Sequence, residues 1–232
     1  MSYNGVILLY NDVIYEVFIV VMKEDKNNKD IILETAKRLF LDNGYHKVSM
    51  RTLAKEAGIS TGPLYFHFQN KSDVFFAICC EALDSLNAVV ARAAGLPMPN
   101  TLKLREIFMA FDRFYREEPV YSQLIRMSFH PLSGIEYTEE QRSMLFDKKL
   151  EHMREMERVI REGIQCGELQ NIDATRFMLV LYSLGEGIFT ANEMGDLKHF
   201  GISVTELVEV ASKLTYTGIR NAGGGHADGG IT

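Results

Sequence analysis

The chain has 232 residues, of which 47% are hydrophobic, and it carries a formal net charge of −6. This hydrophobic content excludes a disordered chain, because a globular protein of this length can bury a substantial core in one or two domains. The three cysteines, Cys79, Cys80 and Cys166, include no Cys-x-x-Cys pair, which argues against a disulfide framework or a zinc site and fits a reducing cytoplasm. We expect all three to be small buried side chains, with Cys166 as a redox sensor being the alternative.

The apolar segment 6–22 has no basic residue before Lys23 and is interrupted by Asn, Asp and Glu. It therefore lacks the features of a secretory signal, and its polar residues do not suit a membrane span. We interpret residues 1–22 as a non-native or disordered extension, with translation starting at Met22. A membrane-associating segment is the alternative interpretation.

Helical periodicity dominates from residue 28 to residue 220, so the sequence predicts an all-α fold. In the first predicted helix, apolar residues from Ile32 to Phe40 recur at helical spacing. Gly44 then supplies a stop signal.

Two short helices joined by a tight corner are predicted next. Ser49 is a favourable N-cap for the first of them, which Gly58 ends. Ser60 caps the second, and Pro63 is tolerated in its first turn. Asn70 caps the helix that follows, which runs to about residue 93. A helix-turn-helix needs such a small-residue corner so that its second helix can enter the major groove of DNA.

The remaining chain is predicted to be helical up to a glycine-rich tail. The segment 95–100 contains Gly and Pro and is the best boundary within the chain. The tail at 221–232 is too rich in glycine to pack, so we expect it to be disordered. Further helices are predicted at 101–117, 119–130, 138–166, 173–194 and 203–220.

Charge is distributed unevenly along the chain. From Lys23 to Lys71 there are nine Lys or Arg against six Asp or Glu, whereas the rest of the chain has a net charge of −9. A mildly basic N-terminal segment attached to an acidic remainder indicates that this segment contacts phosphates. The negative net charge of the whole chain, taken alone, would argue against nucleic-acid binding.

The predicted corner and its flanks resemble one family in particular. Residues 62–73 read GPLYFHFQNKSD, which resembles the recognition-helix signature of the TetR family of bacterial repressors. The stretch ILETAKRLF at 32–40, followed by Asn43-Gly44-Tyr45, resembles the first helix of that family. The resemblance implies a helix-turn-helix DNA-binding domain at 23–75 with a linking helix at 71–93, and a larger helical effector-binding and dimerisation domain at 94–220.

The resemblance also implies which residues contact DNA. Ser49 would hold a phosphate, and Arg51 would reach the DNA backbone or a base edge. Lys71 would grip a phosphate, which would offset the cost of a cation in the first turn of a helix. Phe66 and Phe68 are expected to pack inward. The full predicted set is Ser49, Arg51, Ser60, Thr61, Gly62, Pro63, Tyr65, His67 and Lys71.

The helix predicted at 173–194 is apolar on most sides, so most of its surface must be covered. Pairing of the last two helices with a second copy is the economical solution, and the family resemblance implies the same four-helix interface. A fully buried helix in a monomer is the alternative. The predicted interface residues are Leu181, Leu184, Ile188, Leu207, Ala211 and Leu214.

The middle helices are rich in Phe and Met, for which a packed core is the default interpretation. The family resemblance implies a ligand cavity here, and such walls suit an apolar or aromatic guest. Arg126, His130 and Arg154 could meet a polar end of that ligand. The predicted pocket residues are Phe108, Phe111, Phe114, Met127, Met153, Met156 and Phe177.

Taken together, these features predict a cytoplasmic, homodimeric transcriptional regulator that binds double-stranded operator DNA. We expect a repressor that a small apolar or aromatic effector releases from a palindromic operator. A DNA-binding protein of the same fold that acts without effector in chromosome organisation is the alternative. We expect no enzyme activity, cofactor, metal or membrane partner, because no catalytic constellation stands out. The sequence does not identify the effector, the operator or the regulated genes, and it leaves repression against activation open.

Overall fold

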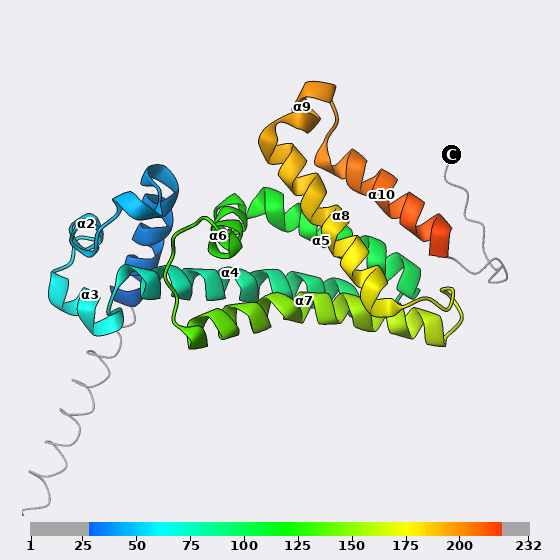
Figure 1. Cartoon of the computed structure of the whole chain (residues 1–232), viewed down its shortest axis with the longest axis horizontal. Coiled ribbons are helices and arrows are strands. Elements are labelled where there is room, and N and C mark those ends of the chain that lie inside the picture. The colour runs from blue at the N-terminus through cyan, green and yellow to red at the C-terminus, as the bar shows by residue number, and fades with distance from the viewer. Residues whose placement is uncertain (1–27, 220–232) are drawn as a thin grey trace, which may run out of the picture. The chain divides into compact units, whose positions relative to one another are not determined.

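The computed structural model describes residues 28–219, and every regular element in that range is a helix (Figure 1). The predicted all-α fold is therefore confirmed. The interpretations of 1–22 and 221–232 lie outside the described residues. The described residues divide into two compact units, one combining 28–79 with Met127–Thr138, and the other combining Cys80–Arg126 with 139–219. This division falls inside the helix Lys71–Ala94, whereas the boundary predicted from the sequence is the break at 95–100.

The first unit contains the predicted short helices. A helix at 28–43 is followed by η1 (Tyr45–Lys47), α2 (Met50–Glu56), α3 (Thr61–His67) and the start of α4 (Lys71–Ala94). The short 3-10 helix η1 was not predicted, because three residues carry no periodic signal. The side chains that form the core of this unit share almost complete burial: Ile32, Ala36, Phe40, Leu53, Leu64 and Phe75.

The helix caps of this unit follow local sequence signals. Ser49 Oγ accepts a hydrogen bond from the Thr52 backbone N–H at 3.0 Å, as its capping role predicts. Asn70 Oδ1 accepts from the Asp73 backbone N–H at 2.9 Å and starts α4. Ser60 stands at the N-cap position of α3, but its side chain makes no capping bond there, so that part of the prediction is wrong.

The second unit is built around α5 (Asn100–Glu117), which packs against α7 (Glu139–Gln165) and α10 (Val204–Ile219). It also contains most of α6 (Pro119–Phe129), together with α8 (Ala174–Met194) and the short α9 (Asp196–Phe200). The long helices agree with the predicted ranges to within a residue or two. The five-residue α9 was not predicted, because it is too short to show a helical period.

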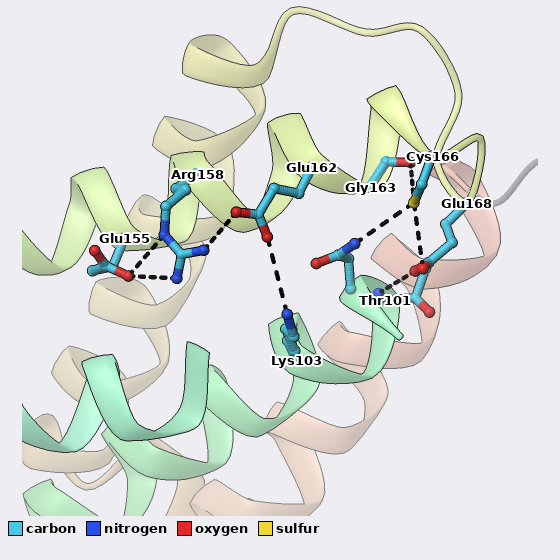
Figure 2. Close-up of polar contacts among 9 residues, drawn as sticks. Thr101, Lys103, Glu155, Arg158, Glu162, Gly163, Cys166 and Glu168 are labelled. Carbon is cyan, nitrogen blue, oxygen red and sulfur yellow. Dashed lines mark hydrogen bonds and ion pairs between the residues drawn. The ribbon is translucent and has the colours of Figure 1, made fainter. Parts of the chain in front are cut away.

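Polar contacts join the start of α5 to the end of α7 (Figure 2). Pro99 provides no side-chain cap for α5, but Glu168 Oε2 accepts from the Thr101 backbone N–H at 3.2 Å. A carboxylate at this position also complements the positive end of the helix dipole. Lys103 Nζ lies 4.0 Å from Glu162 Oε2, which adds an ion pair between the two helices. The C-terminal end of α7 is therefore fastened to the N-terminal end of α5.

The cysteines do not all follow the expectation of burial. Cys79 is buried, Cys80 is half-buried, and burial raises the pKa of the Cys80 thiol to about 11. Cys166 is exposed, so the expectation is wrong for this residue. It lies after the last turn of α7, where its thiol donates weakly to Glu168 Oε1 at 3.4 Å (Figure 2).

The long helix α4 is apolar enough to cross a membrane if judged by length and composition alone, with a mean hydropathy of 1.7 in its most apolar stretch. Its apolar residues Val74, Phe75, Ile78, Leu83 and Val90 are, however, completely buried within the fold. A buried core helix passes the same compositional test.

Candidate nucleic-acid interface

The corner between α2 and α3 has the geometry of a helix-turn-helix. Gly58 has a backbone φ of 69°, in the left-handed region that favours glycine. The Ile59 N–H donates to the Ala54 carbonyl at 3.1 Å, which closes the corner. Leu53 and Ala54 of α2 and Leu64 of α3 are buried, so both helices are anchored in the core of the first unit.

The predicted DNA contacts mostly reach the protein surface. Ser49 and Arg51 are exposed at the start of α2. Pro63 and His67 are half-buried. Leu64 and Phe68 are buried and hold α3 in place. The exposed members of the predicted set around α3 are Ser60, Thr61, Gly62 and Tyr65.

Phe66 differs from the sequence-based expectation, because 75% of its surface is exposed. The prediction that it packs inward is wrong. Leu64 and Phe68 both point into the core, and a residue two positions from each lies roughly 200° around the helix from them. That spacing was a signal in the sequence that Phe66 faces outward. An exposed aromatic ring on a recognition helix can contact a thymine methyl group.

Lys71 has an internal role that the sequence did not indicate. Its ammonium donates to the Tyr45 carbonyl at 2.8 Å and lies 4.2 Å from the centre of the Tyr45 ring. Partial burial lowers the pKa of Lys71. The cost of a cation at a helix start is therefore offset inside the protein, and that cost no longer argues for an external phosphate. An ammonium has three donors, so the phosphate contact stays a prediction.

The segment Met127–Thr138 belongs to the same compact unit as these helices. The His46 Nε2 atom lies 2.8 Å from the Ser133 carbonyl, which accepts its hydrogen bond. The Ser128 and Tyr137 hydroxyls are 2.9 Å apart, and burial raises the pKa of Tyr137. Met127, predicted to line an effector pocket, therefore belongs to the first unit, whereas the apolar spaces lie in the second.

Two narrow apolar spaces lie in the second unit, and Phe108 and Leu181 line both. Each leaves about 10 Å³ for the centre of a water-sized sphere, which is room for about one water. Of the predicted pocket residues, Phe108, Phe111, Met156 and Phe177 line these spaces, whereas Phe114 and Met153 are buried core residues. These two spaces are therefore too small for a larger apolar guest.

The predicted dimer surface needs correction. Leu181, Ile188 and Ala211 are 1%, 4% and 6% exposed, so they have no surface to offer a partner. A helix that is apolar all round buries one face within its own chain, and these three predicted residues lie on buried faces, whereas the predicted Leu184 and Leu214 are exposed. Leu207 is half-buried. The large apolar side chains that α8 and α10 leave exposed include Leu179, Val180, Leu184, Val210 and Leu214, with Met194 at the end of α8.

The three residues suggested for the polar end of a ligand are not brought together. Arg126 lines a cleft in the second unit. Arg154 is exposed and lies 3.9 Å from Asp147. His130 belongs to the first unit, where its Nδ1 accepts from the Leu132 backbone N–H at 3.1 Å.

An all-helical chain with this corner and this exposed second helix is a helix-turn-helix protein of the DNA-binding class. Residues 32–78 match the family described as bacterial regulatory proteins, tetR family. Residues 32–78 therefore carry the DNA-binding module of the TetR family, as the resemblance of the motifs predicts. This is a family of regulatory proteins rather than of enzymes.

Two curated relatives are similar over the N-terminal part. The HTH-type transcriptional repressor BepR of Brucella suis biovar 1 (strain 1330) is 31% identical over 97 residues, which are 41% of this chain and 46% of that protein. The HTH-type transcriptional activator FasR of Mycolicibacterium smegmatis (strain ATCC 700084 / mc(2)155) is 32% identical over 94 residues, which are 40% of this chain and 43% of that protein. The chain thus matches less than half the length of either relative.

Solved structures are similar over most of the chain. The transcriptional regulator FadR from Bacillus subtilis in complex with stearoyl-CoA has a TM-score of 0.67 and 19% identity, covering 82% of this chain and 98% of that one. AibR in complex with isovaleryl coenzyme A and operator DNA has a TM-score of 0.63 and 20% identity, covering 81% and 97%. At these identities the likeness shows a shared fold.

Proposed function

We propose that this protein is a ligand-responsive transcriptional regulator that binds operator DNA through α2 and α3. The observation that carries this proposal is the two-sided character of α3. Leu64 and Phe68 anchor the helix in the core, while Thr61, Tyr65 and Phe66 face outward. The polar groups of such a surface position the protein on phosphates, and its small and apolar groups meet base edges. Because the targets are DNA sites, the protein acts in the cytoplasm.

The same proposal includes a homodimer. A single seven-residue recognition helix contacts few bases, and two copies read two half-sites of a palindrome. The exposed apolar face of α8 and α10 supports this arrangement: Val180 is 58% and Leu214 is 70% exposed. A second copy of the chain would remove this surface from water.

We further propose that the effector is an apolar acyl compound, such as an acyl-coenzyme A. The names of two solved relatives of the same fold include acyl-coenzyme A ligands, with a long and a short acyl chain. The Phe108 and Leu181 walls suit an acyl chain. Since these spaces are small, the ligand would select a more open conformation and so change the affinity for DNA. We favour release of a repressor over activation.

The test begins with purified protein and fragmented genomic DNA, from which bound fragments are sequenced. A regulator enriches few fragments that share an inverted repeat. Fluorescence anisotropy on that repeat, with stearoyl- and isovaleryl-coenzyme A as probes, should then show affinity falling by roughly 5–150-fold. Dispersed binding without a shared repeat and without response to either probe would instead support the alternative role in chromosome organisation.

A matched pair of glycines on α8 locates the effector site. A Cβ at Gly185 would lie 3.8 Å from the Phe108 ring and narrow the apolar space, whereas one at Gly187 meets nothing within 4 Å. Both alanine substitutions gain helix propensity equally. Gly185→Ala should therefore weaken the response to acyl-coenzyme A by about tenfold, and Gly187→Ala should not. Equal responses would exclude this space as the acyl site.

A further inference from the structure

A polar cleft in the second unit is larger than the two apolar spaces, and the proposed function does not use it. It is formed by α5, α6, α8 and the start of α10. The centre of a water-sized sphere can move through about 180 Å³ of it. One water needs only roughly 10–15 Å³ by this measure. The cleft therefore has room for a small organic molecule, unlike the two apolar spaces.

One wall of the cleft carries a buried carboxylate. Asp112 is 0% exposed, and its Oδ2 accepts from Arg116 Nε at 3.2 Å and from Thr205 Oγ1 at 3.0 Å. Its Oδ1 is also buried but has no hydrogen-bond partner among the described residues. A buried carboxylate oxygen is costly unless a donor reaches it. This wall is therefore suited to a ligand that carries an N–H or O–H donor.

A second part of the wall presents a guanidinium. Arg126 forms an ion pair with Glu193 and lies over the ring of Tyr115, with its Cζ 5.1 Å from the ring centre. Its Nη1 is buried and has no hydrogen-bond partner within residues 28–219. An unengaged guanidinium nitrogen in a cleft is suited to an acceptor, and a carboxylate is its best match.

The charges that line the cleft cancel. Asp112 pairs with Arg116 and Glu193 pairs with Arg126, so two acidic groups balance two basic groups. A ligand with a net charge would enter without compensation, whereas a ligand with one charge of each sign would be matched at both walls. The remaining lining includes Tyr115, Phe189 and Val204, which offer an apolar surface.

We propose that this cleft binds a small zwitterion, namely an α-amino acid with an apolar side chain. Its ammonium donates to Asp112 Oδ1, its carboxylate accepts from Arg126 Nη1, and its side chain lies against Tyr115 and Phe189. The site is separate from the proposed acyl site, so its existence does not depend on acyl-coenzyme A binding or on DNA binding.

Isothermal titration calorimetry on the full chain tests the proposal with L-leucine and L-phenylalanine as probes. At least one of them should bind saturably. Two analogues of leucine, isoamylamine without the carboxylate and 4-methylpentanoate without the ammonium, should bind about tenfold more weakly or worse, because each lacks one charge-assisted hydrogen bond. No saturable binding of either amino acid up to about 10 mM would overturn the proposal.

Two substitutions assign the site. Asp112→Asn and Arg126→Lys should each weaken amino-acid binding about tenfold or more. The same exchanges in an exposed pair on α7, Asp147→Asn and Arg154→Lys, serve as controls and should leave binding unchanged. If Asp112→Asn does not fold, Arg126→Lys by itself tests the site. Lysine retains the positive charge beside Glu193, but its single nitrogen cannot replace both the ion pair and the Nη1 contact with the ligand. Unchanged binding in Arg126→Lys would place the ligand elsewhere.

Discussion

The rings of Tyr115 and Phe189 stack with their centroids 3.9 Å apart and their planes 9° from parallel. Phe189 lines both the apolar space and the polar cleft of the second unit. The Tyr115 hydroxyl donates to Glu186 at 3.2 Å, and Glu186 lines the apolar space. The stacked pair thus forms a partition between the two spaces, so a ligand that moves one ring changes the shape of both.

We expect Phe189→Ala to destabilise the protein, because Phe189 is 5% exposed and loses both its burial and the stack. The free energy of unfolding should fall by about 3–5 kcal/mol, measured by urea denaturation. Phe200→Ala on α9 removes the same atoms from a side chain that is 72% exposed. This control should change the free energy of unfolding by less than about 0.5 kcal/mol. Similar losses in both variants would mean that the burial and stacking of Phe189 add no stability beyond that of an exposed ring.

Phe66→Ala tests the outward face of α3. Operator affinity should fall by about tenfold or more, because a large exposed ring loses its apolar contact with DNA. The free energy of unfolding should stay the same, since the ring is mostly in solvent. Leu132→Ala, at a residue of the same unit that is 86% exposed, is the control for loss of surface apolar area. Unchanged affinity on Phe66→Ala would remove this residue from the DNA-contacting set.

Lys71→Met separates the internal role of Lys71 from a phosphate contact. Loss of the bond to the Tyr45 carbonyl should destabilise the first unit by about 1–2 kcal/mol, measured by thermal or urea unfolding. If Lys71 also contacts a phosphate, the slope of log affinity against log salt should become shallower by about one. Destabilisation with an unchanged slope would mean that the lysine acts only within the protein.

Leu214→Asp places a charge in the exposed apolar face of α10. A dimer that uses this face should dissociate, since a buried unpaired carboxylate is costly. Sedimentation velocity should show a shift from dimer to monomer, together with a loss of operator binding. Phe146→Asp, at another exposed apolar residue on α7, should leave the dimer intact. A dimer that survives Leu214→Asp would place the interface elsewhere.

His152 should make stability depend on pH. Burial first, and the nearby charge of Lys149 second, lower the pKa of His152 from 6.5 to about 4. Its Nδ1 donates to Asn87 Oδ1 at 2.9 Å, so the neutral ring is held in place. The unfolded chain binds this proton more tightly than the folded protein does. The free energy of unfolding is therefore highest above pH 6.5, and it falls by about 3 kcal/mol in all as the pH drops to 4 and below.

Urea denaturation between pH 7.5 and pH 4 measures this loss as a function of pH. His152→Gln should remove most of the pH dependence that arises in this window, whereas His199→Gln, at an exposed position on α9, should retain it. An identical pH profile for both variants would exclude His152 as the source.

Local sequence signals determined the first unit well. The Ser49 and Asn70 caps and the Gly58 corner depend on hydrogen bonds and backbone angles within a few residues, so they could be predicted without knowledge of the fold. The same is true of the family, because its motif is a continuous stretch within 32–78. Phe66 could have been placed correctly from its spacing to Leu64 and Phe68.

Only the tertiary structure decided which side of α8 faces inward. Leu181 and Val180 are equally apolar in sequence, yet one is 1% and the other 58% exposed, because a helix that is apolar all round carries no periodic signal to orient it. The contact of Lys71 with Tyr45 likewise joins residues 26 positions apart. The polar cleft draws Asp112, Arg126 and Glu193 from three helices, and their charges balance only because the packing of those helices brings them to one space.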